Sequence, residues 1–300
     1  MLVEAVEAAD AEINFDIIDD LSPNAVLDRV TLPSIVTLNY QAALHSRWQP
    51  QQIREVQARG SKVLVIFHDT GVPNSDRCKA VVDAADVTIV HEPCDDLPAE
   101  KVRYWRMGVP AWSFPIHAPV PNVYRSWEWQ PTLGSVGFPF PWKNYDELAR
   151  VTAACGWALL LLAPNATETD CRRWATLNPH LYVRTDFLPR ATVISHLAGC
   201  DATAFLYTCA NTGQSGAILQ GIAARKPVIA LRTCRQNRAL FLDDLGNEVI
   251  RWCDTFEDVA SQLRHLCLGR LDPGIVALAE QESWTKLGAK YATLYRELQP

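Results

Sequence analysis

The chain has 300 residues, of which 48% are apolar and 21% charged, a balance typical of an ordinary globular protein with two domains. Its net charge is −6, and residues 1–130 hold 18 acidic against 11 basic side chains, which argues against non-specific nucleic-acid binding. No apolar run approaches the roughly 18 residues of a membrane span, and no basic segment precedes an apolar one at the start, so we expect a cytoplasmic protein.

The first part of the chain alternates predicted strands with predicted helices. After a short amphipathic helix over residues 1–10, strand patterns occur at 12–18, 34–40, 62–67, 86–90 and 102–106. Helical patterns cover 50–59 and 75–85. This alternation predicts a parallel, doubly wound α/β domain.

Polar residues follow two of these strands. His68 and Asp69 come after the strand 62–67, and His91 and Glu92 come after the next one. Ligands collect at the carboxyl ends of parallel strands, so these residues are candidates for acid–base chemistry. The alternative for Asp69 is that it caps the following turn.

Prolines and tryptophans dominate the span 104–142, which holds seven of the former and five of the latter. Such a composition indicates an irregular connector, so we place a domain boundary near residue 130. The tryptophans either form an aromatic platform for a sugar or base or cover a seam between domains.

The second part of the chain repeats the alternation. Strands are expected at 132–136, 158–163, 181–183, 201–207 and 228–231, and helices at 144–155, 170–177, 190–198, 215–225 and 254–268. We assign residues 131–282 to a second Rossmann-like domain, and residues 283–300 to an amphipathic helix.

The unit spanning residues 201–231 contains the strongest candidate for a ligand site. Its helix begins with Ser215, Gly216 and Ala217, whose backbone N–H groups at the positive end of the helix dipole suit a phosphate. The alternative is that Gly213 and Gly216 form a tight turn and Ser215 only caps the helix.

Arginines at spacing three follow the strand 228–231, namely Arg232, Arg235 and Arg238. They hold a phosphate or an anionic acceptor, or they form a solvated face. A nucleic-acid acceptor would be expected to contact this patch.

Nine cysteines are scattered along the chain without a Cys-x-x-Cys pair. An odd count of this kind favours reduced, buried thiols over a disulfide framework or a zinc site. His265 and Cys267 are two apart on a predicted helix and point to different faces. We therefore expect no metal site.

The second domain resembles the GT-B class of nucleotide-sugar glycosyltransferases. Gly134-Ser135-Val136-Gly137 followed by Lys143 is similar to the class's first strand and phosphate-contacting lysine. The stretch Asp186-Phe187-Leu188 resembles the nucleobase pocket, and the helix from Ser215 resembles the one that holds the diphosphate. The resemblance therefore implies two Rossmann-like domains facing across a cleft, and a C-terminal helix over residues 283–300 that crosses back to the first domain.

Three departures from the class pattern concern the donor site and the first domain. Thr212 and Gln220 stand where many retaining members carry two glutamates, and Phe138 stands where an arginine is common. The usual opening strand with its glycine-rich turn is missing, which implies a shortened first domain. The donor-binding residues that the resemblance implies are Gly137, Phe138, Lys143, Asp186, Phe187, Leu188, Thr212, Gly213, Gln214, Ser215, Gly216, Ala217 and Gln220.

The implied activity is metal-independent transfer of a sugar from a nucleotide-diphosphate sugar, a UDP-sugar or a GDP-sugar, with no further cofactor. Asp69 is the candidate general base, or His68 positions the donor, with His91 and Glu92 in reserve. The acceptor is unknown: a glycan, a small molecule or a modified nucleic acid. Two alternatives remain, a catalytically silent nucleotide-sugar binding protein and a nucleotide-sugar epimerase.

Overall fold

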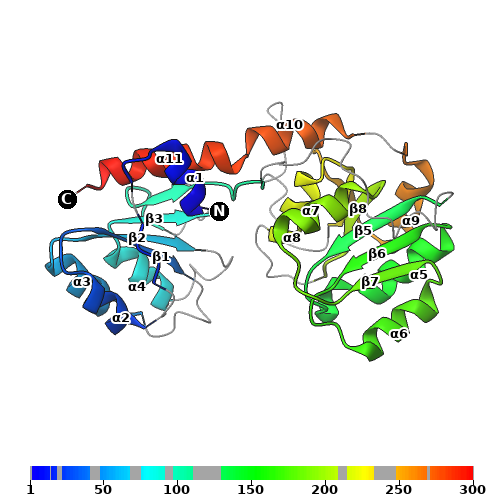
Figure 1. The fold of residues 1–300 in the computed structure, drawn as a ribbon, viewed down its shortest axis with the longest axis horizontal. Helices are drawn as coiled ribbons and strands as arrows, with labels where there is room; N and C mark the ends of the chain where they lie inside the picture. Colours follow the sequence, from blue (N-terminus) through cyan, green and yellow to red (C-terminus); the bar gives the residue numbers. More distant parts are fainter. Residues whose placement is uncertain are drawn as a thin grey trace. The chain divides into compact units, whose positions relative to one another are not determined.

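The computed structural model describes residues 2–13, 15–18, 22–40, 48–67, 76–91, 97–110, 130–208, 215–232, 248–268 and 271–299. These residues form two compact units (Figure 1). Unit 1 holds the described residues up to Gly108 together with those from Trp284 onward, and unit 2 holds those from Val109 to Ser283. The sequence placed the first boundary near residue 130, whereas the division by contacts falls after Gly108.

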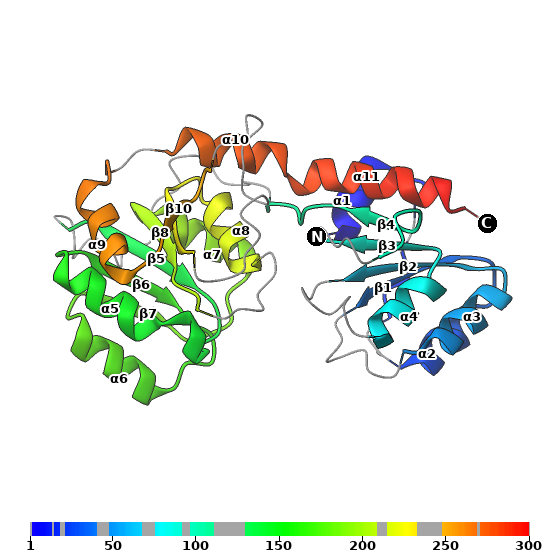
Figure 2. The ribbon, with the colours of Figure 1, turned by 180° about the vertical axis from the view of Figure 1, so that it is seen from behind.

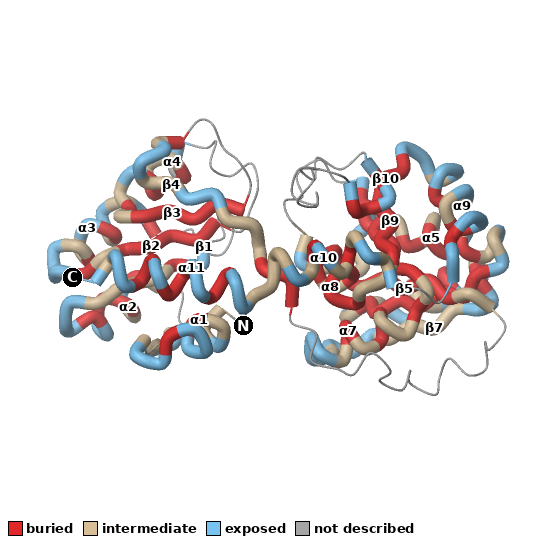
Figure 3. The backbone as a smooth tube through the Cα atoms, turned by 90° about the horizontal axis from the view of Figure 1, so that it is seen from above, coloured by how far each residue is buried: buried red, intermediate tan, exposed pale blue. Residues whose placement is uncertain are grey.

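Unit 1 is built on a sheet of four parallel strands in the order β1-β2-β3-β4. The strands are β1 (Ile35–Tyr40), β2 (Lys62–Phe67), β3 (Val87–Val90) and β4 (Val102–Tyr104). The residues of β2 and β3 are almost completely buried (Figure 3), because helices cover both faces of the sheet. The sequences of these two strands are accordingly nearly continuous apolar runs.

Five helices of the described residues surround this sheet. They are α1 (Leu2–Ala9), α2 (Pro23–Arg29), α3 (Pro50–Ala58), α4 (Asp76–Ala84) and α11 (Trp284–Glu297). Helices α2, α3 and α4 share one apolar cluster with β2, and α1 and α11 share the cluster on the opposite face (Figure 2). The last helix of the chain therefore completes the core of the first unit.

The strand predicted at 12–18 is wrong for the described residues of that segment, which are neither strand nor helix. Ile13 and Phe15 pack against one apolar cluster and Ile18 against the other, while Ile17 is 66% exposed. The segment instead lines a cavity of about 670 Å³ beside β1. The alternating pattern reported burial of side chains correctly, but burial alone does not require hydrogen bonds to a neighbouring strand.

Unit 2 is built on a sheet of six parallel strands in the order β10-β9-β8-β5-β6-β7. The strands are β5 (Thr132–Val136), β6 (Ala158–Leu162), β7 (Leu181–Arg184), β8 (Ala202–Phe205), β9 (Val228–Leu231) and β10 (Arg251–Cys253). The helices are α5 (Tyr145–Ala154), α6 (Glu168–Leu177), α7 (Arg190–Ala198), α8 (Gly216–Ala223), α9 (Phe256–His265) and α10 (Pro273–Gln281). Among the described helices of both units, none combines the length and apolar character that crossing a bilayer requires.

The direction of winding reverses between β5 and β8. The chain moves outward from β5 through β6 to β7, then returns to place β8 on the other side of β5. Only two residue pairs join these strands, Leu133 with Ala202 and Gly134 with Thr203, although each strand continues for two residues more. The carboxyl ends therefore separate at the topological switch point, where open α/β sheets bind their ligands.

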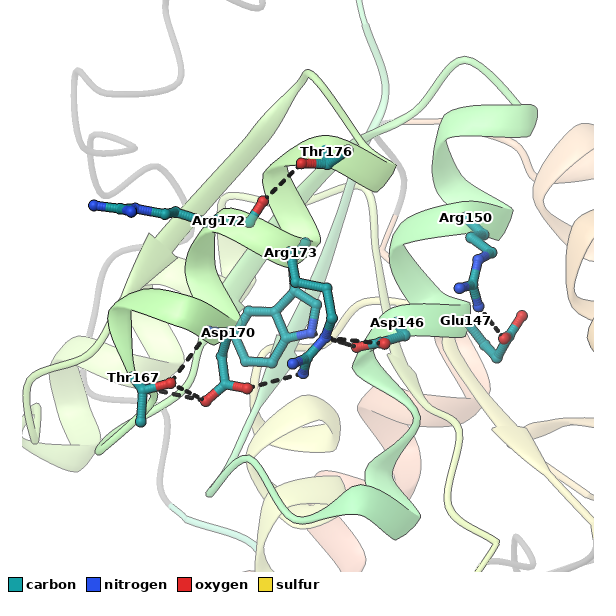
Figure 4. Close-up of polar contacts among 9 residues, drawn as sticks. Asp146, Glu147, Arg150, Thr167, Asp170, Arg172, Arg173 and Thr176 are labelled. Carbon is teal, nitrogen blue, oxygen red and sulfur yellow. Dashed lines mark hydrogen bonds and ion pairs between the residues drawn. The ribbon is translucent and has the colours of Figure 1, made fainter.

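Helices α5 and α6 are joined by a polar clasp (Figure 4). The carboxylate of Asp146 accepts hydrogen bonds from Trp174 Nε1 at 2.7 Å and from Arg173 Nε at 3.0 Å. Arg173 also donates to Asp170 at 2.8 Å, and Asp170 in turn forms a capping box with Thr167. The clasp holds these two helices together on the face of the sheet that α9 also covers.

Candidate functional site

The loop after β5 brings a buried lysine to the switch point. Gly137 has a φ of +133°, a value that glycine adopts readily and other residues rarely do. A methyl group in place of its hydrogen would overlap Lys143 Nζ. Tyr145 holds the same point by donating its hydroxyl to the Gly137 carbonyl at 2.8 Å. Gly137 is therefore required both by its backbone conformation and by the ammonium beside it.

Lys143 has an uncompensated charge. The residue is only 7% exposed, and within the described part of the chain no carboxylate pairs with its ammonium. Its neighbours are aromatic: Nζ lies 5.4 Å from the ring centre of Trp142 and 5.2 Å from that of Tyr207. Burial lowers the pKa of Lys143 from 10.5 to about 8, because desolvation disfavours the charged form. A bound anion would restore the favourable environment that burial removes.

The amino end of α8 follows the second strand at the switch point. Ser215 is the N-cap, and its hydroxyl accepts from the Ile218 N–H at 3.5 Å. A side chain added at Gly216 would meet no described residue within 4 Å, so the described part of the chain leaves the space beside the first helical residue open. Capping by Ser215 leaves the N–H groups of Gly216 and Ala217 available to an anion.

Gln220 lies one turn further along α8. Its Oε1 is buried and has no hydrogen-bond partner among the described residues. A buried acceptor without a partner is unfavourable, by about 1–3 kcal/mol. A donor on a bound ligand would satisfy it.

The segment after β7 carries the residues expected to line a nucleobase pocket. Asp186 is already paired: Arg184 donates Nε to Oδ1 at 2.8 Å and a terminal nitrogen to Oδ2 at 2.6 Å. The hydrogen bonds from Arg184 lower the pKa of Asp186. Phe187 is 79% exposed, and Leu188 follows it in the irregular turn before α7. The ring of Phe187 is thus free to stack, while the Asp186 carboxylate is engaged.

Two exposed aromatic rings lie on the loop between β5 and Lys143. Phe138 and Phe140 are 39% and 50% exposed, and Phe140 stacks on Trp142 with ring centres 5.5 Å apart. A row of aromatic rings therefore runs from the surface to the buried ammonium. Phe138 offers no charge where the class commonly has an arginine.

The remaining described candidates lie elsewhere. Arg232 follows β9 and has its guanidinium 3.6 Å from Asp254 and 3.9 Å from Glu248, so two carboxylates already offset its charge. His91 directly follows β3 of unit 1, is 6% exposed, and has its Nδ1 2.8 Å from the Trp105 carbonyl oxygen. Because that oxygen can only accept, the neutral ring carries its proton on Nδ1, which leaves a basic Nε2.

Several predicted residues lie outside the described residues, and their predicted roles stay predictions: His68, Asp69, Glu92, Thr212, Gly213, Gln214, Arg235 and Arg238. Within the described ranges, no group of three or more His, Cys, Asp or Glu side chains is placed to hold a metal ion. The sequence predicted Trp142 only as one of the tryptophans of an aromatic platform or a seam between domains, and it predicted no role for Tyr207. For Tyr207 the available signal was its place at the carboxyl end of the strand pattern that becomes β8.

Comparison with known proteins identifies the architecture. No protein-family profile and no curated protein sequence matches the chain. Solved structures do match: sucrose-phosphate synthase from Thermosynechococcus elongatus superposes with a TM-score of 0.63 at 15% identity, covering 88% of this chain and 73% of that one. The fold is GT-B. The predicted pair of parallel α/β units of this class is thereby confirmed.

Two further GT-B structures bear on ligand and length. HepE of Anabaena, solved in complex with UDP-glucose, has a TM-score of 0.64 at 12% identity and covers 92% of this chain and 81% of that one. The GtfA/B complex has a TM-score of 0.62 at 14% identity and covers 92% of this chain. This chain spans only 60% of that matched chain. At these sequence identities the similarity shows a shared fold alone.

Proposed function

We propose that this GT-B protein is a glycosyltransferase that binds the diphosphate of a nucleotide sugar at the switch point of unit 2. The observation that carries the proposal is the ammonium of Lys143, buried between two aromatic rings with no carboxylate partner among the described residues. Burial of such a group is unfavourable unless something compensates the desolvation, and a bound anion would do so. The amino end of α8, which follows β8 in the chain, supplies further donors, the N–H groups of Gly216 and Ala217.

The chemistry that this arrangement supports is departure of a nucleoside diphosphate. As the bond to the sugar breaks, negative charge grows on the diphosphate oxygens. Lys143 and the N–H groups of Gly216 and Ala217 stabilise that charge more strongly in the transition state than in the bound donor. A fixed set of donors in a site with little water does this without reorganising. We assign this role to these residues.

We further propose that the donor is a UDP-sugar or a GDP-sugar. The exposed ring of Phe187 after β7 is suited to stack on the base, since every base has a π face. The buried Oε1 of Gln220, which lacks a hydrogen-bond donor among the described residues, accepts a hydrogen bond from a hydroxyl of the sugar. Gln220 takes this position without the negative charge that a glutamate would bring.

We keep Asp69 as the proposed general base for the acceptor hydroxyl, with His68 positioning the donor as the alternative, and His91 and Glu92 as the reserve pair. His91 has the tautomer that a general base requires, with its Nδ1 proton held by the Trp105 carbonyl. The acceptor's proton leaves as the oxygen attacks the sugar, and a neutral imidazole nitrogen can take it. The acceptor is a glycan, a small molecule or a modified nucleic acid.

Isothermal titration calorimetry with UDP, GDP, ADP and CDP tests the donor site. We expect one nucleotide to bind selectively, and Lys143→Ala to weaken it by about tenfold or more, corresponding to about 1.4 kcal/mol. Lys290→Ala is the matched control, because Lys290 is exposed on α11 of unit 1. Equal affinity in wild type and Lys143→Ala would contradict the assigned site.

The second candidate is a nucleotide-sugar binding protein without transferase activity. It is favoured by Thr212 and Gln220, which stand where many retaining members of the class have glutamates. The two candidates differ in one measurement, the release of free nucleoside diphosphate from the nucleotide sugar that binds. Release that depends on an acceptor supports the transferase, and tight binding without release across an acceptor panel supports the silent protein.

A further inference from the structure

We propose that Asn144 is the positioning residue that joins the two ligand-facing loops of unit 2 and thereby fixes Lys143. Its part in ligand binding rests on the proposed function, whereas its part in placing Lys143 does not. The residue directly follows Lys143 and precedes α5.

The geometry creates a need for such a link. Strands β5 and β8 pair only as far as Gly134 and Thr203, so the chain segments beyond them are not held together by the sheet. These are the segments that carry Lys143 on one side and lead toward α8 on the other. Without a bridge, the ends of the two strands would be free to move apart.

Asn144 supplies the bridge with its side-chain amide. Nδ2 donates to the Leu206 carbonyl at 2.6 Å and lies 3.1 Å from Thr208 Oγ1. The backbone adds a parallel contact, in which the Thr208 N–H donates to the Trp142 carbonyl at 2.9 Å. The residues that Asn144 contacts flank Tyr207, the ring that lies 5.2 Å from Lys143 Nζ. A single amide therefore holds both the lysine loop and the ring beside the lysine.

The Asn144 side chain does not make the capping hydrogen bond that asparagine usually makes at a helix N-cap. Asn144 is the N-cap of α5, yet its side chain makes no capping hydrogen bond. Its backbone is left-handed, with φ 53° and ψ 42°, a conformation that asparagine and glycine tolerate better than other residues. Asparagine is thus suited to this position because it accepts the backbone conformation and also provides a donor.

The variant Asn144→Gly tests the proposal, because glycine keeps the left-handed backbone and removes only the amide. Asn165→Gly is the matched control: Asn165 is also left-handed, with φ 66°, in the loop after β6. Thr208→Val removes one acceptor and decides the question if Asn144→Gly does not fold.

The primary readout is the pKa of Lys143, followed through the Cε signal of carbon-13-labelled lysine and assigned by its absence in Lys143→Arg. We expect Asn144→Gly to raise this pKa from about 8 toward the ordinary value of 10.5, because the freed loops admit water to the ammonium. Thr208→Val should shift it in the same direction by less, and Asn165→Gly should leave it unchanged. An unchanged Lys143 pKa in folded Asn144→Gly would overturn the proposal.

The second readout is affinity for inorganic pyrophosphate and UDP by calorimetry. We expect Asn144→Gly to lose between about tenfold and a hundredfold, as small misplacements of binding groups do, while Asn165→Gly binds as wild type. Wild-type protein that binds neither ligand would refute the proposed function alone, since the Lys143 pKa still reports whether Asn144 positions the loops. Full affinity in Asn144→Gly would overturn the coupling to the ligand.

Discussion

At the scale of single residues, the buried ammonium of Lys143 lowers the stability of the ligand-free protein, although it favours binding of an anion. Its ammonium is buried against Trp142 and Tyr207 and lacks a carboxylate among the described residues. The pKa of Lys143 falls to about 8 for that reason. The neighbouring Tyr145 does not offset the charge, because burial raises its own pKa well above 10. The ligand-free protein is therefore less stable than it would be with an apolar side chain at this position.

Lys143→Met should raise the free energy of unfolding of the ligand-free protein at pH 7 by up to about 3 kcal/mol, given about 1.4 kcal/mol per pKa unit. The folded pKa lies below the unfolded one, so the unfolded state binds more protons between pH 8 and 10.5 and wild-type stability rises with pH across that window. The advantage of methionine should accordingly shrink there. Calorimetric unfolding at pH 7 and pH 10 measures both effects.

Two results would contradict this interpretation of Lys143. One is a methionine variant less stable than wild type at pH 7, and the other is an advantage that does not change with pH. Lys290→Met is the control, since Lys290 is exposed and its replacement should change stability by no more than about 0.5 kcal/mol.

At the scale of elements, the clasp between α5 and α6 depends on one carboxylate. Asp146 accepts from the indole of Trp174, a residue only 2% exposed, and from Arg173. By contrast, Glu147 pairs with Arg150 at the exposed surface of α5. Removal of the Asp146 carboxylate therefore leaves a buried indole N–H without its acceptor, whereas removal of the Glu147 carboxylate leaves only an exposed guanidinium.

Asp146→Ala should destabilise unit 2 by about 1–3 kcal/mol, because the buried Trp174 N–H loses its acceptor. Glu147→Ala should change stability by less than about 1 kcal/mol, as exposed ion pairs do. Hydrogen exchange of peptides from α5 and α6 measures the difference within the unit. Equal protection in the two variants would show that the indole hydrogen bond contributes little.

Sequence patterns predicted most elements of both units but not their pairing. The apolar runs that became β2, β3, β6 and β8 were evident because buried parallel strands are continuous in apolar residues. The pattern at 12–18 misled, since Ile13 and Phe15 are buried without a strand being formed. The short strand β10 and helices α2 and α10 were not predicted from the sequence.

At the scale of the whole molecule, unit 1 depends on both ends of the chain. Helix α11 packs on α1, and Tyr295 bonds to Thr37 of β1 through their hydroxyls at 3.0 Å. Gly288 of α11 lies so close to α1 that an added methyl would overlap the carbonyl of Ala5. The polypeptide therefore leaves unit 1 after Gly108 and must return at Trp284 to complete its core.

Gly288→Ala should destabilise unit 1 by about 1–3 kcal/mol, because the overlap is with backbone and the helices must shift apart. Nucleotide affinity, which we assign to unit 2, should not change. Hydrogen exchange of α1 and calorimetry with the selected nucleotide report on the two units separately. Unchanged protection of α1 would show that the packing tolerates the methyl group.

Sequence patterns were sufficient to predict the class of fold, the alternation of strands and helices, and the places of Lys143, Ser215 and Gly216 at strand and helix ends. These follow from local periodicity, turn chemistry and motif spacing, which a short stretch of chain carries alone. The sequence patterns did not predict that Lys143 is buried without a carboxylate partner among the described residues, that Arg232 and Asp186 are already paired, or that Asn144 bridges two loops. The bridge from Asn144 to Leu206 joins residues 62 positions apart in the chain, and no local pattern records which distant segments meet.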